Sequence, residues 1–197
     1  YDPAASAQLA YDPAGARALL AEAGYLDSDG DGILETPGGE PFALELLIHR
    51  NRERQDIAEL MVAGLLNVGV AAEVELVEWG SLVGRVTSPE RDFDGAVLSW
   101  APEFRLDDRD LFHSDRLEGP FSFSGISDPE LDGLMDALPL MTDRAEAEEA
   151  WRAFQARLVE LQPFTILYFP DRIAGRADRL QGLVMDARGE WASIHGW

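Results

Sequence analysis

The sequence predicts an α/β protein in which a βαβαβ-type mixed sheet is flanked by helices. Segments with the alternating apolar pattern of strands are interleaved with segments whose apolar residues recur at helical spacing. Glycine and proline separate these segments, as expected at turns. The chain has 197 residues, of which 46% are hydrophobic, so it is long enough to bury a core without disulfides.

The first half of the chain alternates between helix and strand. Asp12 and Pro13 predict a helix start, and Gly24 predicts its end. A second helix is predicted by five apolar residues at helical spacing before Gly69: Ile57, Leu60, Met61, Leu65 and Val68. Together with a short third helix, the predicted elements of this half are helix 13–23, strand 42–48, helix 53–68, strand 70–77, helix 80–87 and strand 93–100.

The second half has a different organisation. Residues 101–127 are irregular and rich in aromatic side chains, and a connection of that length is usually functional or disordered. Helices are expected from Asp128 to about 138 and over 143–161. The apolar run Phe164–Phe169 predicts a buried central strand. Trp191 and Trp197 need a surface to cover, either on this domain or on a partner.

Composition excludes several classes of function. With 16 Lys and Arg against 37 Asp and Glu, the formal net charge is −21, which disfavours binding to nucleic acid or to anionic lipid. The chain has no cysteine, so disulfides, thiolate metal sites and thiol catalysis are excluded. No nucleophile elbow, phosphate-binding loop or dinucleotide fingerprint is present, and His49, His113 and His195 lack ligand spacing. We therefore expect no enzyme activity and no required cofactor.

An acidic loop over residues 27–35 has the spacing of a calcium-binding loop. Asp27, Asp29 and Asp31 occupy positions 1, 3 and 5, and Gly32 occupies position 6, where the backbone must turn sharply. Glu35 could add a further oxygen. Position 12 is Gly38 in place of the usual glutamate, so affinity should be modest unless Glu40 substitutes. A structural Ca²⁺ and a bare Asp-Gly turn both remain open.

The segment from Phe93 to Glu103 is the best candidate for ligand contact. It predicts an apolar strand that ends at Trp100, with Glu103 three residues further on. Ligands of open α/β sheets bind outside the carboxyl ends of the strands. A tryptophan and a carboxylate there would suit an apolar ligand with a cationic group. The alternative is a core tryptophan and a solvated glutamate.

The order of several such stretches resembles that of one family. The stretches are Tyr11-Asp12-Pro13 through Gly24-Tyr25, the acidic loop, Glu78-Trp79, Phe93-Asp94 to Trp100, Asp107-Asp108 to Phe112, Phe123-Ser124-Gly125 to Asp132, and Pro163 to Asp171. Together they are similar to the peptide, nickel and oligosaccharide class (family 5) of extracytoplasmic solute-binding proteins of ABC transporters.

The resemblance implies one lobe of a two-lobed periplasmic-binding-protein fold, which closes over its ligand at a hinge. Its implied organisation is a hinge or entry segment over 1–12, an α/β ligand-binding lobe over 13–177 and a C-terminal return segment over 178–197. The first lobe of the same protein is then an expected partner. The other expected partner is the membrane permease of an ABC importer. The expected location is periplasmic or extracellular, associated with the outer face of the inner membrane.

The resemblance also implies the site residues. Trp79 and Trp100 match cleft tryptophans, Glu103 falls where peptide-binding members pair an aspartate with the ligand amino group, and Phe104 follows it in the site. Where relatives have ligand-contacting arginines, this chain has two valines, although two arginines lie near; the four are Val86, Val97, Arg85 and Arg105. The implied function is binding of a peptide-like or cationic small solute in a cleft between two lobes. A carboxylate-dependent hydrolase acting through the 101–118 loop and a calcium-dependent structural or interaction module are the alternatives.

Overall fold

The computed structural model describes residues 10–100 and 107–170, together with residues 175, 177–179, 181 and 184. The chain divides into two compact units: residues 1–100 with 107–163, and residues 101–106 with 164–197. The first unit contains the elements described below. The hinge, lobe and return-segment boundaries expected at residues 12 and 177 stay predictions.

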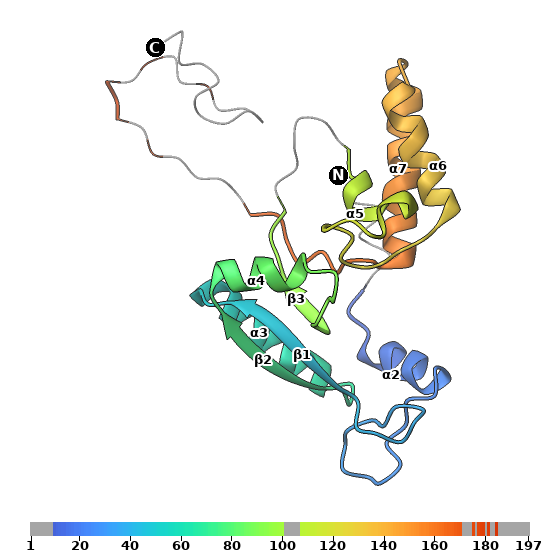
Figure 1. Cartoon of the computed structure of the whole chain (residues 1–197), viewed down its shortest axis with the longest axis vertical. Coiled ribbons are helices and arrows are strands. Elements are labelled where there is room, and N and C mark those ends of the chain that lie inside the picture. Colours follow the sequence, from blue (N-terminus) through green and yellow to red (C-terminus); the bar gives the residue numbers. More distant parts are fainter. Residues whose placement is uncertain are drawn as a thin grey trace. The chain divides into compact units, whose positions relative to one another are not determined.

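A three-stranded sheet forms the centre of the first unit (Figure 1). Its strands are β1 (Ala43–His49), β2 (Ala71–Val77) and β3 (Gly95–Val97), in the order β2-β1-β3. Both pairings are parallel, which requires crossover connections of the βαβ type. The α/β class is therefore confirmed. All the described strands run parallel, where the sequence led us to expect a mixed sheet.

The register brings the carboxyl ends of the three strands to one edge. His49 at the end of β1 pairs with Val77 at the end of β2, and Ile48 pairs with Val97 at the end of β3. Because both crossovers return the chain to the opposite edge, each strand enters there and leaves at the shared carboxyl edge. The segments that follow the strands are therefore gathered at that edge.

Two helices cover the two faces of the sheet. Side chains alternate along β1, so Leu46 and Ile48 pack with Ala58 of α3 (Arg52–Leu66). Leu47 points the other way and packs with Leu82 of α4 (Trp79–Val86). Leu60 fits the apolar helical spacing of α3 but is 75% exposed. The buried face of α3 is formed by Ile57, Ala58, Met61, Val62 and Leu65.

The N-terminal part attaches to this sheet through the acidic loop. Helix α2 (Pro13–Glu22) begins at Asp12, whose side chain accepts a hydrogen bond from the Gly15 backbone N–H. After it, the Leu34 N–H donates to the Gly69 carbonyl at 2.7 Å. Gly69 has a φ of +86°, and a Cβ there would lie 2.8 Å from the Leu34 side chain. Glycine is thus required where the loop meets the turn between α3 and β2.

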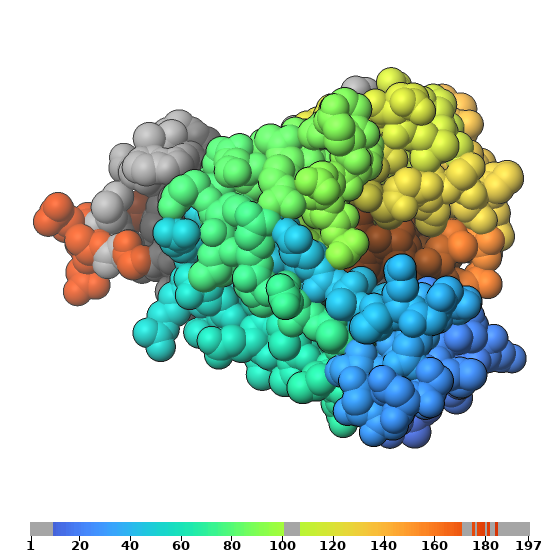
Figure 2. Space-filling model, turned by 60° about the horizontal axis from the view of Figure 1, so that its bottom comes forward, coloured from blue at the N-terminus to red at the C-terminus, as the bar shows by residue number. Residues whose placement is uncertain are grey.

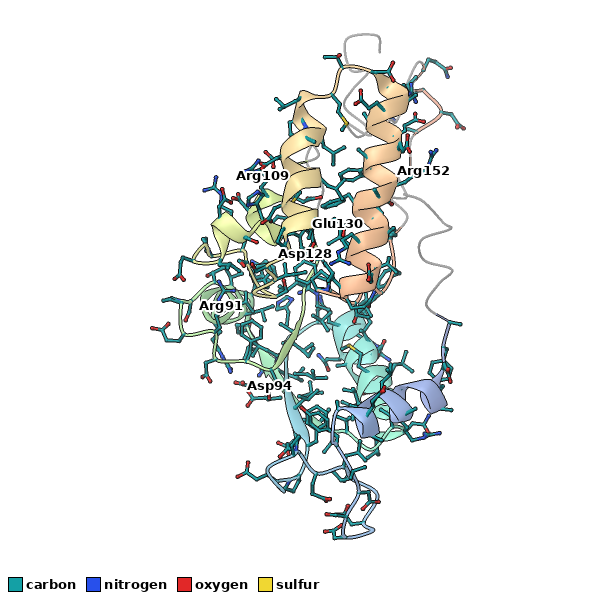
Figure 3. All side chains as sticks on the ribbon, turned by 90° about the vertical axis from the view of Figure 1, so that its right-hand side faces the viewer. Arg91, Asp94, Arg109, Asp128, Glu130 and Arg152 are labelled. Carbon is teal, nitrogen blue, oxygen red and sulfur yellow. The ribbon has the colours of Figure 1, made fainter. Side chains whose placement is uncertain are left out.

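A helical part follows the sheet. It contains α5 (Arg109–Phe112), the short 3₁₀ turns η1 (Ser114–Arg116) and η2 (Leu138–Leu140), α6 (Pro129–Ala137) and α7 (Arg144–Leu161). Helices α6 and α7 lie side by side as a hairpin (Figures 1 and 3). The two helices match those expected over 128–138 and 143–161. Their shared core contains Leu131 and Phe154, and the Trp151 ring stacks on Phe154 with centroids 4.9 Å apart.

Asp128 joins the two helices of this hairpin. Its Oδ1 accepts the Leu131 N–H at 2.8 Å, which caps α6, and its Oδ2 accepts Nη2 of Arg157 in α7 at 2.6 Å. Figure 3 labels Asp128 and Glu130 where α6 begins, on its side toward α7. The Arg157 guanidinium and the Leu131 N–H hold the pKa of Asp128 below its ordinary value.

One predicted strand is wrong. Residues 164–170 form no strand, and Ile166 and Phe169 are largely exposed. A continuous apolar run is typical of a buried strand, but it does not show whether a neighbouring strand is available to bond to its backbone. The strand predicted over 93–100 is also shorter than expected, since only Gly95–Val97 pair with β1.

Two leucines that differ in exposure test the position of the core. Leu47→Ala should lower the free energy of unfolding by about 2–5 kcal/mol, because Leu47 is fully buried between β1 and α4. Leu60→Ala removes the same atoms from an exposed position and should change it by less than about 0.5 kcal/mol. Urea unfolding followed by circular dichroism measures both, and equal losses would contradict the packing of the sheet.

The pKa of Asp128 predicts a stability difference that depends on pH. Asn also caps helices, so Asp128→Asn removes the charge and keeps the cap. A carboxylate whose pKa is lowered in the folded state stabilises above its unfolded pKa of about 3.9, and this contribution is lost as the pH falls through the folded pKa. The difference in unfolding free energy between the parent and Asp128→Asn should be constant above about pH 5 and shrink below about pH 4.

Asp143→Asn is the matched control for that experiment. Asp143 caps α7 through the Glu146 N–H at 3.0 Å and has no arginine within ion-pair distance in the described part of the chain. The same pH dependence in both variants would show that the Arg157 contact is not the cause.

Candidate functional site

The carboxyl edge of the sheet gathers residues from three separate segments. His49 ends β1, Trp79 begins α4 directly after β2, and Ser99 and Trp100 follow β3. Arg54 comes from the first turn of α3, which starts just beyond β1. We call these five residues the carboxyl-edge site. In open parallel sheets this is the edge at which ligands bind.

Arg54 connects the two outer segments of the carboxyl-edge site. Its guanidinium carbon lies 5.5 Å from the centroid of the Trp79 ring, a cation–π distance. Its Nη2 donates to the Ser99 Oγ at 2.9 Å, and its Nη1 lies 3.4 Å from the Val97 carbonyl oxygen. Asn51 fixes the start of α3 by accepting the Arg54 backbone N–H at 2.8 Å. Arg54 therefore joins the segments after β2 and β3 across the end of β1.

Both tryptophans are held at the edge with part of their surface in water. Trp79 is 49% exposed and meets the His49 ring edge-on, with centroids 5.6 Å apart. Trp100 is 52% exposed and meets Phe121 edge-on at the same distance. Each ring thus meets an aromatic neighbour edge-on and keeps part of its apolar surface exposed.

Arg91 holds the loop that supports Trp100. Arg91 donates to the carbonyl oxygens of Ser122, Leu117 and Gly119 (Figure 3). Its backbone has a φ of 49°, which is unusual for a residue with a side chain. These bonds fix the loop that carries Phe121, which contacts Trp100.

Only some of the residues predicted to bind a solute lie in the described part of the chain. Trp79 and Trp100 lie in the carboxyl-edge site, and their role in binding a solute stays a prediction. Glu103, Phe104 and Arg105 lie outside the described residues.

The valines at the expected arginine positions are both buried. Val86 packs against Leu47, and Val97 packs with Leu46 and Ile48. Neither of them presents a side chain at the carboxyl edge.

Arg85 is engaged elsewhere. Its guanidinium donates to Glu75 and to the Asp92 carbonyl, and it lies 3.4 Å from Glu45. Hydrogen bonding to Arg85 lowers the pKa of Glu75, while the adjacent Glu75 raises the pKa of Glu45. Arg85 therefore neutralises two strand carboxylates and does not serve the carboxyl edge.

The acidic loop has the geometry of a cation site. One carboxylate oxygen from each of Asp27, Asp29, Asp31 and Glu35 lies within 4.8 Å of the others, and the loop is at the surface (Figure 2, blue). Gly32 has a φ of +93°, as the predicted sharp turn requires. The group does not include Glu40.

Glu35 is held within that loop by hydrogen bonds. Its carboxylate accepts from the Ser28 hydroxyl at 2.6 Å and from the Ser28 backbone N–H at 2.7 Å. These two bonds lower the pKa of Glu35, so it remains a charged oxygen donor in mildly acidic solution.

Arg54, Ser99, His49 and Phe121 were missed as site residues from the sequence. A usable signal existed for Arg54, because it lies three residues after the helix cap Asn51 in the helix that directly follows a strand. Residues in that first turn are near the carboxyl ends of parallel strands. Phe121 gave no local signal, since only the folded loop brings it to Trp100.

In the described part of the chain, His113 belongs to no group with metal-ligand spacing. His113 is buried and its Nδ1 lies 2.8 Å from Asp115, while Arg109 contacts its Nε2. His195 lies outside the described residues. In the described part of the chain, the acidic loop is the one group with metal-ligand spacing.

The fold and the site define a class of protein: an open α/β sheet whose exposed aromatic residues gather at the carboxyl ends of its strands. The comparison with family models assigns that class. Residues 1–116 match the model described as "Bacterial extracellular solute-binding proteins, family 5 Middle", and the chain belongs to this family. No helix in the described ranges is both long and apolar enough to cross a membrane.

Individual relatives agree with this assignment. The oligopeptide-binding protein AppA of Bacillus subtilis is 30% identical over 188 residues, which cover 95% of this chain and 34% of AppA. Di/tripeptide-binding protein 4 of Pseudomonas aeruginosa is 28% identical over 187 residues, which cover 89% of this chain and 32% of that protein. The chain thus spans about a third of the length of these curated relatives.

Solved structures give the same result. The structure of AppA in complex with a nonapeptide superposes with a TM-score of 0.76 at 32% identity, covering 81% of this chain and 32% of that one. NikZ from Campylobacter jejuni in complex with Ni(L-His) has a TM-score of 0.67 at 22% identity, covering 78% and 31%, and shows the shared fold. The relatives named are binding proteins and lend no support to a hydrolase or to a calcium-dependent interaction module.

Proposed function

We propose that this chain is part of the solute-binding component of an ABC importer, and that its carboxyl-edge site forms one wall of the cleft for a peptide-like solute. One observation carries the proposal: two half-exposed tryptophans are fixed at the carboxyl ends of three parallel strands. The relatives named for oligopeptides and di- or tripeptides support the choice of solute.

The chemistry of the site fits binding without turnover. Trp79 and Trp100 offer flat apolar surface for stacking and for removal of the solute from water. Arg54 and Ser99 offer hydrogen bonds that orient a polar group. A cationic part of the solute would be met by Glu103, the residue expected to pair with an amino group.

The partners follow from the family. The permease of the importer would receive the solute. This chain matches about a third of the length of its relatives, and the rest of such a binding protein would form the second wall of the cleft. We propose a location outside the cytoplasmic membrane, on its outer face, because the family is described as extracellular. One wall encloses a solute only partly, so we expect weak binding by this chain alone.

Nuclear magnetic resonance of the indole N–H groups tests the proposal. Titration of this chain with a nonapeptide should shift the indole signals of Trp79 and Trp100 at sub-millimolar to millimolar concentrations. Trp151 is the internal control, because it stacks on Phe154 in α7 at a different part of the fold. Each signal is assigned by a Trp→Phe variant.

Two outcomes would contradict the proposal. In the first, no indole signal shifts with peptides of two to nine residues. In the second, the shifts are confined to Trp151. Sub-micromolar affinity in calorimetry would contradict the idea that a second wall is needed.

We also propose that the acidic loop binds Ca²⁺ as a local structural clip. The support is the approach of four carboxylate oxygens around one point, together with the turn at Gly32. The loop joins α2 to β1 and contacts Gly69, so a cation would stiffen this connection without taking part in solute binding.

Thermal unfolding with and without calcium tests the clip. Calcium at millimolar concentration should raise the melting temperature of this chain by a few degrees, and a chelator should reverse it, because a ligand that binds the folded state stabilises it. Asp31→Asn should abolish the rise. Glu40→Gln makes the same charge change outside the group and should leave it intact. Equal loss in both variants would contradict a defined site.

A further inference from the structure

We infer that Arg91 is a positioning residue for solute binding. It holds the loop 117–122 and, through Phe121, it sets the orientation of the Trp100 ring that meets an apolar part of the solute. This inference rests on the proposed function and deepens it, because it names a residue outside the carboxyl-edge site that controls binding there.

The backbone of Arg91 is the first argument. In the described part of the chain, two residues with side chains have a positive φ, Arg91 at 49° and Gln162 at 48°. Gln162 ends α7, where this conformation is common, but Arg91 lies in the connection between α4 and β3. Glycine adopts such a φ at a lower energetic cost than a residue with a side chain. An arginine at this position therefore points to a use for its side chain.

The contacts of the Arg91 guanidinium are the second argument. Its Nη1 donates to the Ser122 carbonyl oxygen, and its Nη2 donates to the Gly119 carbonyl oxygen at 2.8 Å. Nη2 also lies 3.4 Å from the Leu117 carbonyl oxygen. A hydrogen bond from an ionised donor is stronger than one between neutral groups. Removal of the guanidinium would leave three carbonyl oxygens facing one another without their shared donor, so the loop should loosen.

Phe121 connects this loop to the site. Arg91 holds the backbone on both sides of Phe121, because its acceptors stand before and after that residue. The Phe121 ring meets Trp100 edge-on with centroids 5.6 Å apart, and it meets Phe123 with centroids 6.2 Å apart. Phe123 packs against the core between β1 and α4. A row of aromatic rings therefore runs from the core to Trp100, and its middle ring depends on the loop that Arg91 holds.

The place of Arg91 in the chain separates it from residues that touch the solute. Arg91 precedes β3, whereas Trp100 follows the end of that strand at the carboxyl edge. Its effect on binding therefore passes through the loop and Phe121. Trp100 is half exposed, and an indole ring that is already held in one orientation loses less conformational entropy when a solute packs on it.

Two N-acetylated, amide-ended tetrapeptides provide the probes: tetra-alanine and the same peptide with phenylalanine at its second position. Each is titrated into this chain, and Kd is obtained from the Trp100 indole signal. Arg91→Gly suits the backbone and removes the guanidinium. The phenylalanine peptide should bind this variant about 3- to 10-fold more weakly than the parent, because an oriented aromatic contact is lost, while Kd of tetra-alanine should change less than about 2-fold.

A double-mutant cycle with Phe121→Leu separates positioning from a general loss of stability. Phe121→Leu removes the ring through which Arg91 acts and should weaken the phenylalanine peptide by a similar factor. The double variant should then bind this peptide no more weakly than either single variant. If Arg91→Gly does not fold, the cycle is measured with Arg91→Asn, because asparagine also adopts a positive φ.

Two further measurements complete the experiment. Magnetisation transfer between the Trp100 and Phe121 rings in the solute-free chain should weaken in Arg91→Gly, which reports the ring contact itself. Arg52→Gln is the matched control for charge, because it removes an arginine whose side chain is 94% exposed on α3. It should leave the ring contact and both Kd values unchanged.

The failures are distinguishable. The same Kd of the phenylalanine peptide for the parent and for Arg91→Gly would overturn the positioning role and leave the proposed function intact, as would equal weakening of both peptides. Effects that multiply in the double variant would also overturn it, since Arg91 would then act independently of Phe121. No indole shift in the parent with either tetrapeptide, with the nonapeptide or with the other peptides of two to nine residues would overturn the proposed function together with this inference.

Discussion

The parallel register of the sheet is the constraint on which the rest of the site depends. Because β1, β2 and β3 run in the same direction, the chain leaves all three strands at one edge, although the segments that follow lie far apart in sequence. Trp79 and Trp100 are about 20 residues apart, and yet each follows the end of a strand that pairs with β1. Reversal of any one strand would send its following segment to the opposite edge and divide the site.

The edge is maintained by contacts from both faces of the sheet. Leu47 packs on α4, which begins with Trp79, while Ala58 of α3 packs on Ile48 and sets the position of Arg54. Core packing therefore determines where the functional side chains lie.

The secondary structure was largely predictable because it depends on local spacing. Asp12 and Asp128 each precede a proline and cap helices at the expected residues. The errors arose where tertiary contacts decide. Leu60 matches the helical period and faces water, and the apolar run 164–169 forms no strand. Trp79 and Trp100 were found as candidates from their place after strands, but Arg54 was not, because its role depends on contacts with residues 25 and 45 positions away.

The central claim is that solute binds at the carboxyl edge of this sheet, and the most direct measurement is the position of a bound peptide. A peptide with a nitroxide label broadens nuclear resonances of the protein groups that it approaches. We expect broadening at Trp79, Trp100 and the side-chain Nε–H of Arg54, with little effect on Trp151 in α7. Broadening centred on α6 and α7, with the three edge residues unaffected, would contradict it.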